Sequence, residues 1–161
     1  MALAAGDKIP DVRLMMLTDE GIKPIQSWDI LGSGKVVLIG VPGAFTPTCT
    51  DYHLPGFVLR ADELRAKGVD TIACVSVNDA FVMGAWGRAA GADGKVVMLA
   101  DGSGEFTAAM GLPLDLSAVG LGTRSQRYAA IIEDAVITDL AVEADPRKVN
   151  AGSVEQVLAK L

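Results

Sequence analysis

The segment 35–49 reads Lys35-Val-Val-Leu-Ile-Gly-Val41, followed directly by Pro42-Gly-Ala-Phe-Thr46-Pro-Thr-Cys49. Its first half is a continuous apolar run, which predicts a strand of a parallel sheet that is buried on both faces. Its second half is a proline-bounded loop that ends on a cysteine where a helix is expected to begin. Unpaired backbone N–H groups and the positive end of the helix dipole favour a thiolate at such a position. Cys49 is therefore a candidate nucleophile.

The rest of the chain alternates between strand and helix patterns. A hairpin is expected at the N-terminus, and Pro55 is expected to kink the helix after Cys49 or to mark the start of its regular part. The expected strands after the first are Val69–Val77, Lys95–Ala100, Gln126–Glu133 and Val136–Val142, and the expected helices follow Cys49, Asn78-Asp79, Ser103 and Ser153. This order predicts an α/β fold whose central mixed sheet has helices on both faces. It matches a thioredoxin-like fold with an N-terminal β-hairpin extension, formed by Val12–Leu17 and Ile22–Ile25.

Length and composition exclude several classes of protein. The 161 residues predict a single domain, residues 1–161, with no run long enough to cross a membrane and no secretory signal. The net charge is −6 and the basic residues are dispersed, so neither nucleic acid nor a membrane is expected as a partner. Two cysteines without a C-x-x-C motif and one histidine cannot complete a tetrahedral zinc site, so no metal and no other cofactor is expected. Scarce cysteine is typical of a reducing compartment, which predicts a cytoplasmic protein.

The loop and its flanks resemble the active-site signature of the peroxiredoxins. The matching residues are Pro42-x-x-x-Thr46-x-x-Cys49 and the continuation Tyr52-His53-Leu54-Pro55-Gly56-Phe57. Three further segments are similar to the type II (peroxiredoxin-5-like) branch of the AhpC/TSA redoxin group: Val75–Met83, Ala85-Trp86-Gly87 and Arg124-Ser-Gln-Arg127-Tyr128. The similarity runs from about residue 6 to the C-terminus, so it covers nearly the whole chain. The resemblance implies a thiol peroxidase that reduces hydrogen peroxide and alkyl hydroperoxides and forms a sulfenic acid at Cys49.

The resemblance also implies roles for other residues. Thr46 is expected to hydrogen-bond the sulfur and the peroxide, and Pro42 to shield the thiolate from water. Arg127 matches the catalytic arginine of the family, although the residues alone leave Arg124 as an alternative. A guanidinium suits this role because it stays charged and presents a planar fork of donors.

The peroxide pocket and the partners are expected from the same resemblance. Leu116 and Leu121 are candidates for the pocket lining, which would favour alkyl hydroperoxides over hydrogen peroxide. Members of this branch commonly form homodimers through loops around the active site, so a homodimer is expected. Glutathione with glutaredoxin, or thioredoxin, is the expected reductant, and the sequence does not choose between them.

Cys74 has two open interpretations. It lies 25 residues after Cys49, a spacing that resembles type II members with an internal disulfide. Other members carry the resolving cysteine in the loop before the last helix, and Val149–Gly152 contains none. Cys74 equally fits as a small filler within a buried strand. A disulfide needs Cα atoms within about 7 Å, so a mid-strand Cys74 would require local unfolding of the Cys49 turn. As a filler, it would leave the enzyme dependent on an external thiol.

Two other functions would use the same thiol. A redox sensor or relay would pass oxidation to a partner without turnover. A cysteine–histidine hydrolase is suggested by His53, four residues after Cys49 and on the same face of a helix. Such enzymes hold both groups on separate elements with a third orienting residue, and none is evident. A structural hydrogen bond is therefore the preferred role for His53.

Overall fold

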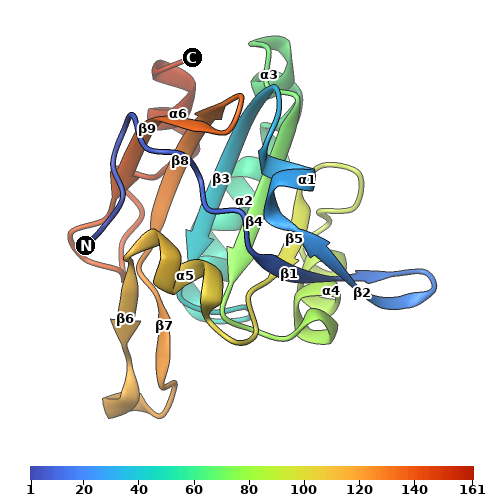
Figure 1. Cartoon of the computed structure of the whole chain (residues 1–161), viewed down its shortest axis with the longest axis vertical. Coiled ribbons are helices and arrows are strands. Elements are labelled where there is room, and N and C mark those ends of the chain that lie inside the picture. Colours follow the sequence, from blue (N-terminus) through green and yellow to red (C-terminus); the bar gives the residue numbers. More distant parts are fainter.

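A seven-stranded sheet forms the centre of the computed structural model, which describes all residues from 1 to 161 (Figure 1). The strand order is β2–β1–β5–β4–β3–β8–β9. The pairs β3–β4 and β4–β5 are parallel and the other pairs are antiparallel, so the sheet is mixed. The strands are β1 (Arg13–Thr18), β2 (Gly21–Gln26), β3 (Lys35–Val41), β4 (Thr71–Ser76), β5 (Val97–Ala100), β8 (Tyr128–Glu133) and β9 (Val136–Val142).

Helices cover both faces of this sheet. They are α1 (Ser27–Leu31), α2 (Leu54–Leu59), α3 (Ala61–Ala66), α4 (Ala80–Ala89), α5 (Glu105–Met110) and α6 (Val154–Ala159), with a π-helical turn η1 (Cys49–His53). No helix is both long and apolar enough to cross a membrane. A separate hairpin projects beyond the sheet and consists of β6 (Pro113–Asp115), the 3-10 turn η2 (Ser117–Val119) and β7 (Thr123–Ser125) (Figure 1).

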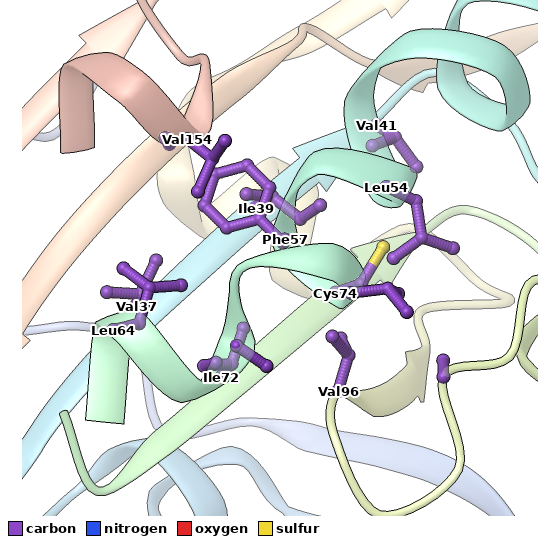
Figure 2. Close-up of a cluster of buried hydrophobic side chains, with 14 of the residues drawn as sticks. Val37, Ile39, Val41, Leu54, Phe57, Leu64, Ile72, Cys74, Val96 and Val154 are labelled. Atoms are coloured by element: carbon purple, nitrogen blue, oxygen red, sulfur yellow. The ribbon is translucent and has the colours of Figure 1, made fainter. Parts of the chain in front are cut away.

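The protein has two apolar cores, and strand β3 contributes side chains to both. Its side chains alternate between the faces, and every residue from Val36 to Val41 is buried. Val37 and Ile39 pack with α2, α3, α4 and α6, whereas Val36 and Leu38 pack with α1 and α5. Figure 2 shows the first of these clusters, with Phe57 and Leu54 of α2 over the strands. The continuous apolar run of the sequence is therefore a strand that is buried on both faces.

The α/β architecture, the mixed sheet and the N-terminal hairpin are confirmed. Strands β4, β5 and β8 each begin two residues later than expected, at Thr71, Val97 and Tyr128. The segment before β8, expected to be a loop, contains the β6–β7 hairpin, and the short α1 was not expected. Both are short elements, and such elements carry little periodicity for a sequence pattern to show.

Pro55 accounts for the irregular helix after Cys49. In a regular α-helix its ring would clash with the carbonyl of Asp51, and it has no N–H to donate. The chain instead makes the wider η1 turn, in which Leu54 N donates to Cys49 O, and α2 then begins with Pro55 in its first turn. The expectation that Pro55 marks the start of the regular helix is confirmed.

Candidate active site

The loop between β3 and η1 is held by its own hydrogen bonds. Thr46 Oγ1 donates to Gly43 O at 2.6 Å, and Thr50 N donates to Thr46 O at 3.0 Å. Ala44 N donates to Asn78 Oδ1 at 2.9 Å, which ties the loop to the end of β4. Phe45 has φ of 62°, a left-handed conformation that is uncommon for a bulky residue and that these contacts hold in place.

Cys49 and Arg127 meet at the carboxyl end of β3. In the β3–β8 pair Gly40 lies opposite Tyr128, so the residue before β8 lies beside the loop that follows β3. Arg127 Nη2 donates to Cys49 Sγ at 3.0 Å, and both residues are buried. The guanidinium is thus a charged donor in direct contact with the sulfur. The thiol is thus enclosed by the protein.

Arg127 is fixed by two further acceptors. Its Nε donates to Pro146 O and its Nη1 donates to His53 Nδ1, each at 2.9 Å. The guanidinium has five N–H groups, and these bonds together with the bond to the sulfur use three of them. One N–H on Nη1 and one on Nη2 remain for a ligand. Arg124, the alternative considered above, instead donates from Nε to Leu121 O on the projecting hairpin.

The partners of His53 determine its protonation. Nε2 lies 2.9 Å from Gly152 O, which can only accept, and Nδ1 faces the Arg127 guanidinium, which can only donate. The ring is therefore neutral, with its proton on Nε2. Burial, and secondarily the charge of Arg127, lower the pKa of His53 to about 3. With both nitrogens engaged, His53 has no free atom with which to act as a base on Cys49, which excludes the hydrolase arrangement.

A pocket of about 140 Å³ opens onto Arg127. Its lining is mostly apolar and comprises Pro42, Thr46, Pro47, Thr48, Leu114, Leu116, Leu121, Arg127, Pro146 and Arg147. Of the residues that the sequence nominated, the structure therefore brings Pro42, Thr46 and both leucines to the pocket beside Arg127. The hydroxyl proton of Thr46 is engaged by Gly43 O, so Thr46 does not donate to the sulfur in this structure.

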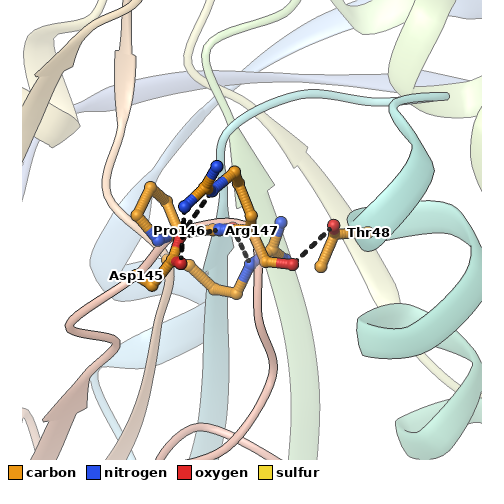
Figure 3. Close-up of polar contacts among 5 residues, drawn as sticks. Thr48, Asp145, Pro146 and Arg147 are labelled. Atoms are coloured by element: carbon orange, nitrogen blue, oxygen red, sulfur yellow. Dashed lines mark hydrogen bonds and ion pairs between the residues drawn. The ribbon is translucent and has the colours of Figure 1, made fainter.

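The β9–α6 loop, residues 143–153, forms one wall of this pocket. Thr48 Oγ1 donates to Arg147 O at 3.0 Å, which links the loop to the turn carrying Cys49 (Figure 3). Asp145 accepts two hydrogen bonds from the Arg147 side chain, and these bonds lower the pKa of Asp145 to about 2. The ion pair between Asp145 and Arg147 fixes the backbone on both sides of Pro146. The carbonyl of Pro146 accepts from Arg127 Nε.

Cys74 lies in the middle of β4, opposite Ile39 of β3 and Met98 of β5. It is fully buried and belongs to the same apolar cluster as Leu54 and Val96 (Figure 2). Burial, and secondarily the nearby Cys49, raise the pKa of Cys74 well above its usual value. Both cysteines are free thiols and belong to the same apolar cluster. Strands β3 and β5, on either side of β4, fix the backbone of Cys74.

Several residues at this site could not be found from the sequence. The carbonyls of Pro146 and Gly152 act through their position alone, and backbone acceptors leave no pattern in a sequence. Asn78 was noted only as a helix start, and it also holds the active-site loop. No group of three or more His, Cys, Asp or Glu side chains is placed to hold a metal ion.

Comparisons with known proteins identify relatives of this chain. The family model described as Redoxin matches residues 4–158. The chain is 47% identical to Peroxiredoxin-2E-2, chloroplastic, of Oryza sativa subsp. japonica, over 99% of this chain and 72% of that protein. Among solved structures it is similar to reduced Prx3 of Vibrio vulnificus in complex with hydrogen peroxide, with 50% identity, 98% of both chains covered and a TM-score of 0.92.

A second solved structure, peroxiredoxin 5 of Alvinella pompejana, is 37% identical with a TM-score of 0.84, and the match covers 98% of this chain and 96% of that one. These neighbours share the thioredoxin-like fold, as the order of strands and helices predicted. The chain therefore belongs to the redoxin family and, within it, to the peroxiredoxins of the AhpC/TSA group, which are thiol-dependent peroxidases.

Proposed function

We propose that Cys49 is the peroxidatic residue and that Arg127 is the group that activates the peroxide. The contact between Arg127 Nη2 and Cys49 Sγ at 3.0 Å carries this proposal. The sulfur attacks one oxygen of the hydroperoxide, and the S–O bond forms while the O–O bond breaks. The second oxygen leaves with the bonding electron pair and takes up a proton, as water or an alcohol. Cys49 is thereby oxidised to a sulfenic acid.

Ionisation of the thiol supplies only a small part of the acceleration. A thiol with an ordinary pKa of about 8.5 is already roughly 3% thiolate at pH 7, so complete ionisation gains about 30-fold at most. Nucleophilicity also falls with basicity, with a slope of about 0.4–0.5 in thiol–disulfide exchange, which removes much of that gain. The larger contribution must come from donors that bind the stretched O–O bond better than the ground state.

The two unused N–H groups of Arg127 are suited to this task. They point from a guanidinium held at Nε, Nη1 and Nη2, so little reorganisation is needed when charge develops on the peroxide oxygens. Thr46 complements them, because a hydroxyl that donates to Gly43 O keeps a lone pair to accept the peroxide O–H. Pro42 limits the access of water to the thiolate.

The pocket supports hydroperoxides with an apolar substituent as substrates. Leu116 and Leu121 line it together with Leu114 and with the prolines of the Cys49 loop. An alkyl group there would lose water-exposed apolar surface, worth about 0.8 kcal/mol for each buried CH₂. Hydrogen peroxide, without such a group, would depend on Arg127 and Thr46 alone.

Recycling of Cys49 needs a thiol. The source is either Cys74, through a Cys49–Cys74 disulfide that forms after η1 unwinds, or an external donor that attacks the sulfenic acid directly. Glutathione with glutaredoxin, or thioredoxin, is the proposed external reductant. We also propose that the chain is a single domain over residues 1–161, that it forms a homodimer and that it acts in the cytoplasm.

Peroxide consumption with each reductant tests this proposal, with the wild type, Cys49→Ser and Cys74→Ser compared. Loss of all turnover in Cys49→Ser, with multiple turnovers in the wild type, is the expected result. Turnover in Cys49→Ser would contradict the assignment, and a wild type that reacts once and stops would indicate a sensor. Mass spectrometry of the peroxide-treated wild type then separates the two routes of recycling: an internal disulfide supports Cys74, and a lasting sulfenic acid supports an external thiol.

A further inference from the structure

Glu143 is a buried carboxylate that faces only the backbone of the loop that follows it. It comes directly after β9 and is 7% exposed. Its oxygens accept from Asn150 N at 2.8 Å, Ala151 N at 3.1 Å and Gly152 N at 2.7 Å. Three backbone donors on one carboxylate are charge-assisted hydrogen bonds, which are shorter and stronger than neutral ones. They fix the end of the β9–α6 loop.

The loop that Glu143 fixes carries the hydrogen-bond acceptor of His53. Gly152 N donates to Glu143, and Gly152 O accepts from His53 Nε2 at 2.9 Å. The two bonds therefore define the peptide planes on both sides of Gly152. The space around this residue is tight as well: an added Cβ would lie 3.3 Å from Ala129 N and 3.4 Å from Glu143 Oε2.

The same loop supports Arg127 from two directions. His53 Nδ1 accepts from Arg127 Nη1, and Pro146 O accepts from Arg127 Nε, each at 2.9 Å. Glu143 also donates from its own N–H to Arg127 O at 2.9 Å, which joins the start of the loop to the backbone of the arginine. Both ends of the loop are thus connected to Arg127, the start through its backbone and the end through His53 to its side chain.

We propose that Glu143 is a positioning residue for the peroxidase reaction, acting through Gly152 and His53 on the guanidinium of Arg127. The proposal rests on the assignment of Arg127 made above. Glu143 touches neither the sulfur nor the pocket, and its effect is to keep the unused N–H groups of Arg127 aimed at the peroxide. A small displacement of a catalytic group costs about 100-fold in rate where a reaction depends on alignment, so a loosened loop should reduce the rate measurably.

The substitution Glu143→Gln tests this proposal. The side chain keeps its size, but one oxygen becomes an NH₂ group that faces a backbone N–H, so at least one of the three bonds is lost. The second-order rate of oxidation by hydrogen peroxide, measured by rapid mixing, should fall by about tenfold or more. The rate of alkylation of Cys49 by iodoacetamide should stay within about threefold, because alkylation needs the thiolate but no donor to a leaving oxygen.

Ser153→Ala is the matched control. Ser153 lies at the end of the same loop and its Oγ accepts from Gln156 N, so this change also removes a hydrogen bond to a backbone N–H, but one that faces α6 and not His53. The oxidation rate of Ser153→Ala should equal that of the wild type. If Glu143→Gln does not fold, Glu143→Asp keeps the charge but withdraws the carboxylate by one CH₂, and the same loss of oxidation rate is expected.

A double variant that combines Glu143→Gln with Arg127→Lys shows whether Glu143 acts by positioning Arg127 or only by stabilising the protein in general. If Glu143 acts through Arg127, then Glu143→Gln should have no further effect on oxidation once Arg127 is Lys. A normal oxidation rate in Glu143→Gln, an equal loss in Ser153→Ala, or fully multiplicative losses in the double variant would overturn the proposal. An unchanged rate in Arg127→Lys alone would instead overturn the assignment of Arg127, so the two failures are distinguishable.

Discussion

At the scale of single residues, the site is a set of donors and acceptors whose protons can be assigned. Arg127 can only donate, Gly152 O can only accept, and between them His53 must be neutral with its proton on Nε2. The arginine therefore carries the positive charge nearest to Cys49. Because this arrangement fails when His53 is protonated, it has a consequence for stability at acid pH.

The free energy of unfolding should fall as the pH drops below about 6.5. His53 has its pKa lowered to about 3 in the folded protein, so between these values the unfolded chain binds a proton that the folded protein does not. Stability is complete above the unfolded pKa and is lost toward low pH, with a slope of up to about 1.4 kcal/mol per pH unit. Urea unfolding of the reduced protein between about pH 5 and pH 7 measures this slope.

His53→Gln is the control for this prediction, since His53 is the single histidine of the chain. Glutamine does not titrate, so the slope of that variant over the same range should be near zero. A slope in His53→Gln equal to that of the wild type would mean that another group titrates there.

Some residues of the site could be predicted from the sequence and others could not. Cys49, Thr46 and Pro42 form a short contiguous motif, and Arg127 belongs to a second one, so a local pattern was sufficient to nominate them. The bond from Arg127 to His53 joins positions 74 residues apart, and the role of Glu143 depends on backbone groups. Such contacts exist only in the folded chain, and no periodicity or motif encodes them.

At the scale of elements, the pairing of β3 with β8 places the arginine beside the cysteine. The register opposes Gly40 to Tyr128, and the ring of Tyr128 lies over the glycine so closely that an added Cβ would overlap it. Gly40 thus allows the two strands to keep the register that aligns Arg127 with the carboxyl end of β3. The long buried strands were predictable from their apolar runs, whereas the short β6–β7 hairpin that carries the pocket leucines was not.

Gly40→Ala should destabilise the protein by about 2 kcal/mol or more, because overpacking forces strain on the tyrosine or on the strand. Denaturant unfolding measures this loss. Gly102→Ala is the comparison, since a Cβ at that position would lie 3.6 Å from Asn78 O, an ordinary contact. Equal stabilities of the two variants would show that the Tyr128 ring moves aside freely.

At the scale of the whole molecule, the exposed apolar side chains lie unevenly around the site. Phe45 is 53% exposed in the active-site loop, and Phe81 is 61% exposed in the first turn of α4. The bond from Ala44 N to Asn78 Oδ1 holds these two segments together. This surface supports the proposed homodimer, because a large apolar side chain is more stable when a second copy covers it.

Phe81→Glu should therefore shift the protein from dimer to monomer in sedimentation velocity experiments, since a charge in an apolar interface is strongly unfavourable. Leu59→Glu is the matched variant, because Leu59 is 81% exposed at the end of α2 and does not line the pocket. It should leave the dimer unchanged. A monomeric wild type, or loss of the dimer in Leu59→Glu alone, would contradict this location of the interface.

In the proposed reaction the fixed guanidinium of Arg127, more than ionisation of the thiol, accelerates the oxidation of Cys49. The most direct measurement is the second-order rate of peroxide oxidation of Cys49 in Arg127→Lys, beside the rate of alkylation of the same thiol. Lysine keeps the positive charge near the sulfur but lacks the planar fork, so oxidation should slow by about 100-fold or more while alkylation changes far less. An Arg127→Lys variant that is oxidised at a rate close to that of the wild type would show that the guanidinium is not the main source of the acceleration.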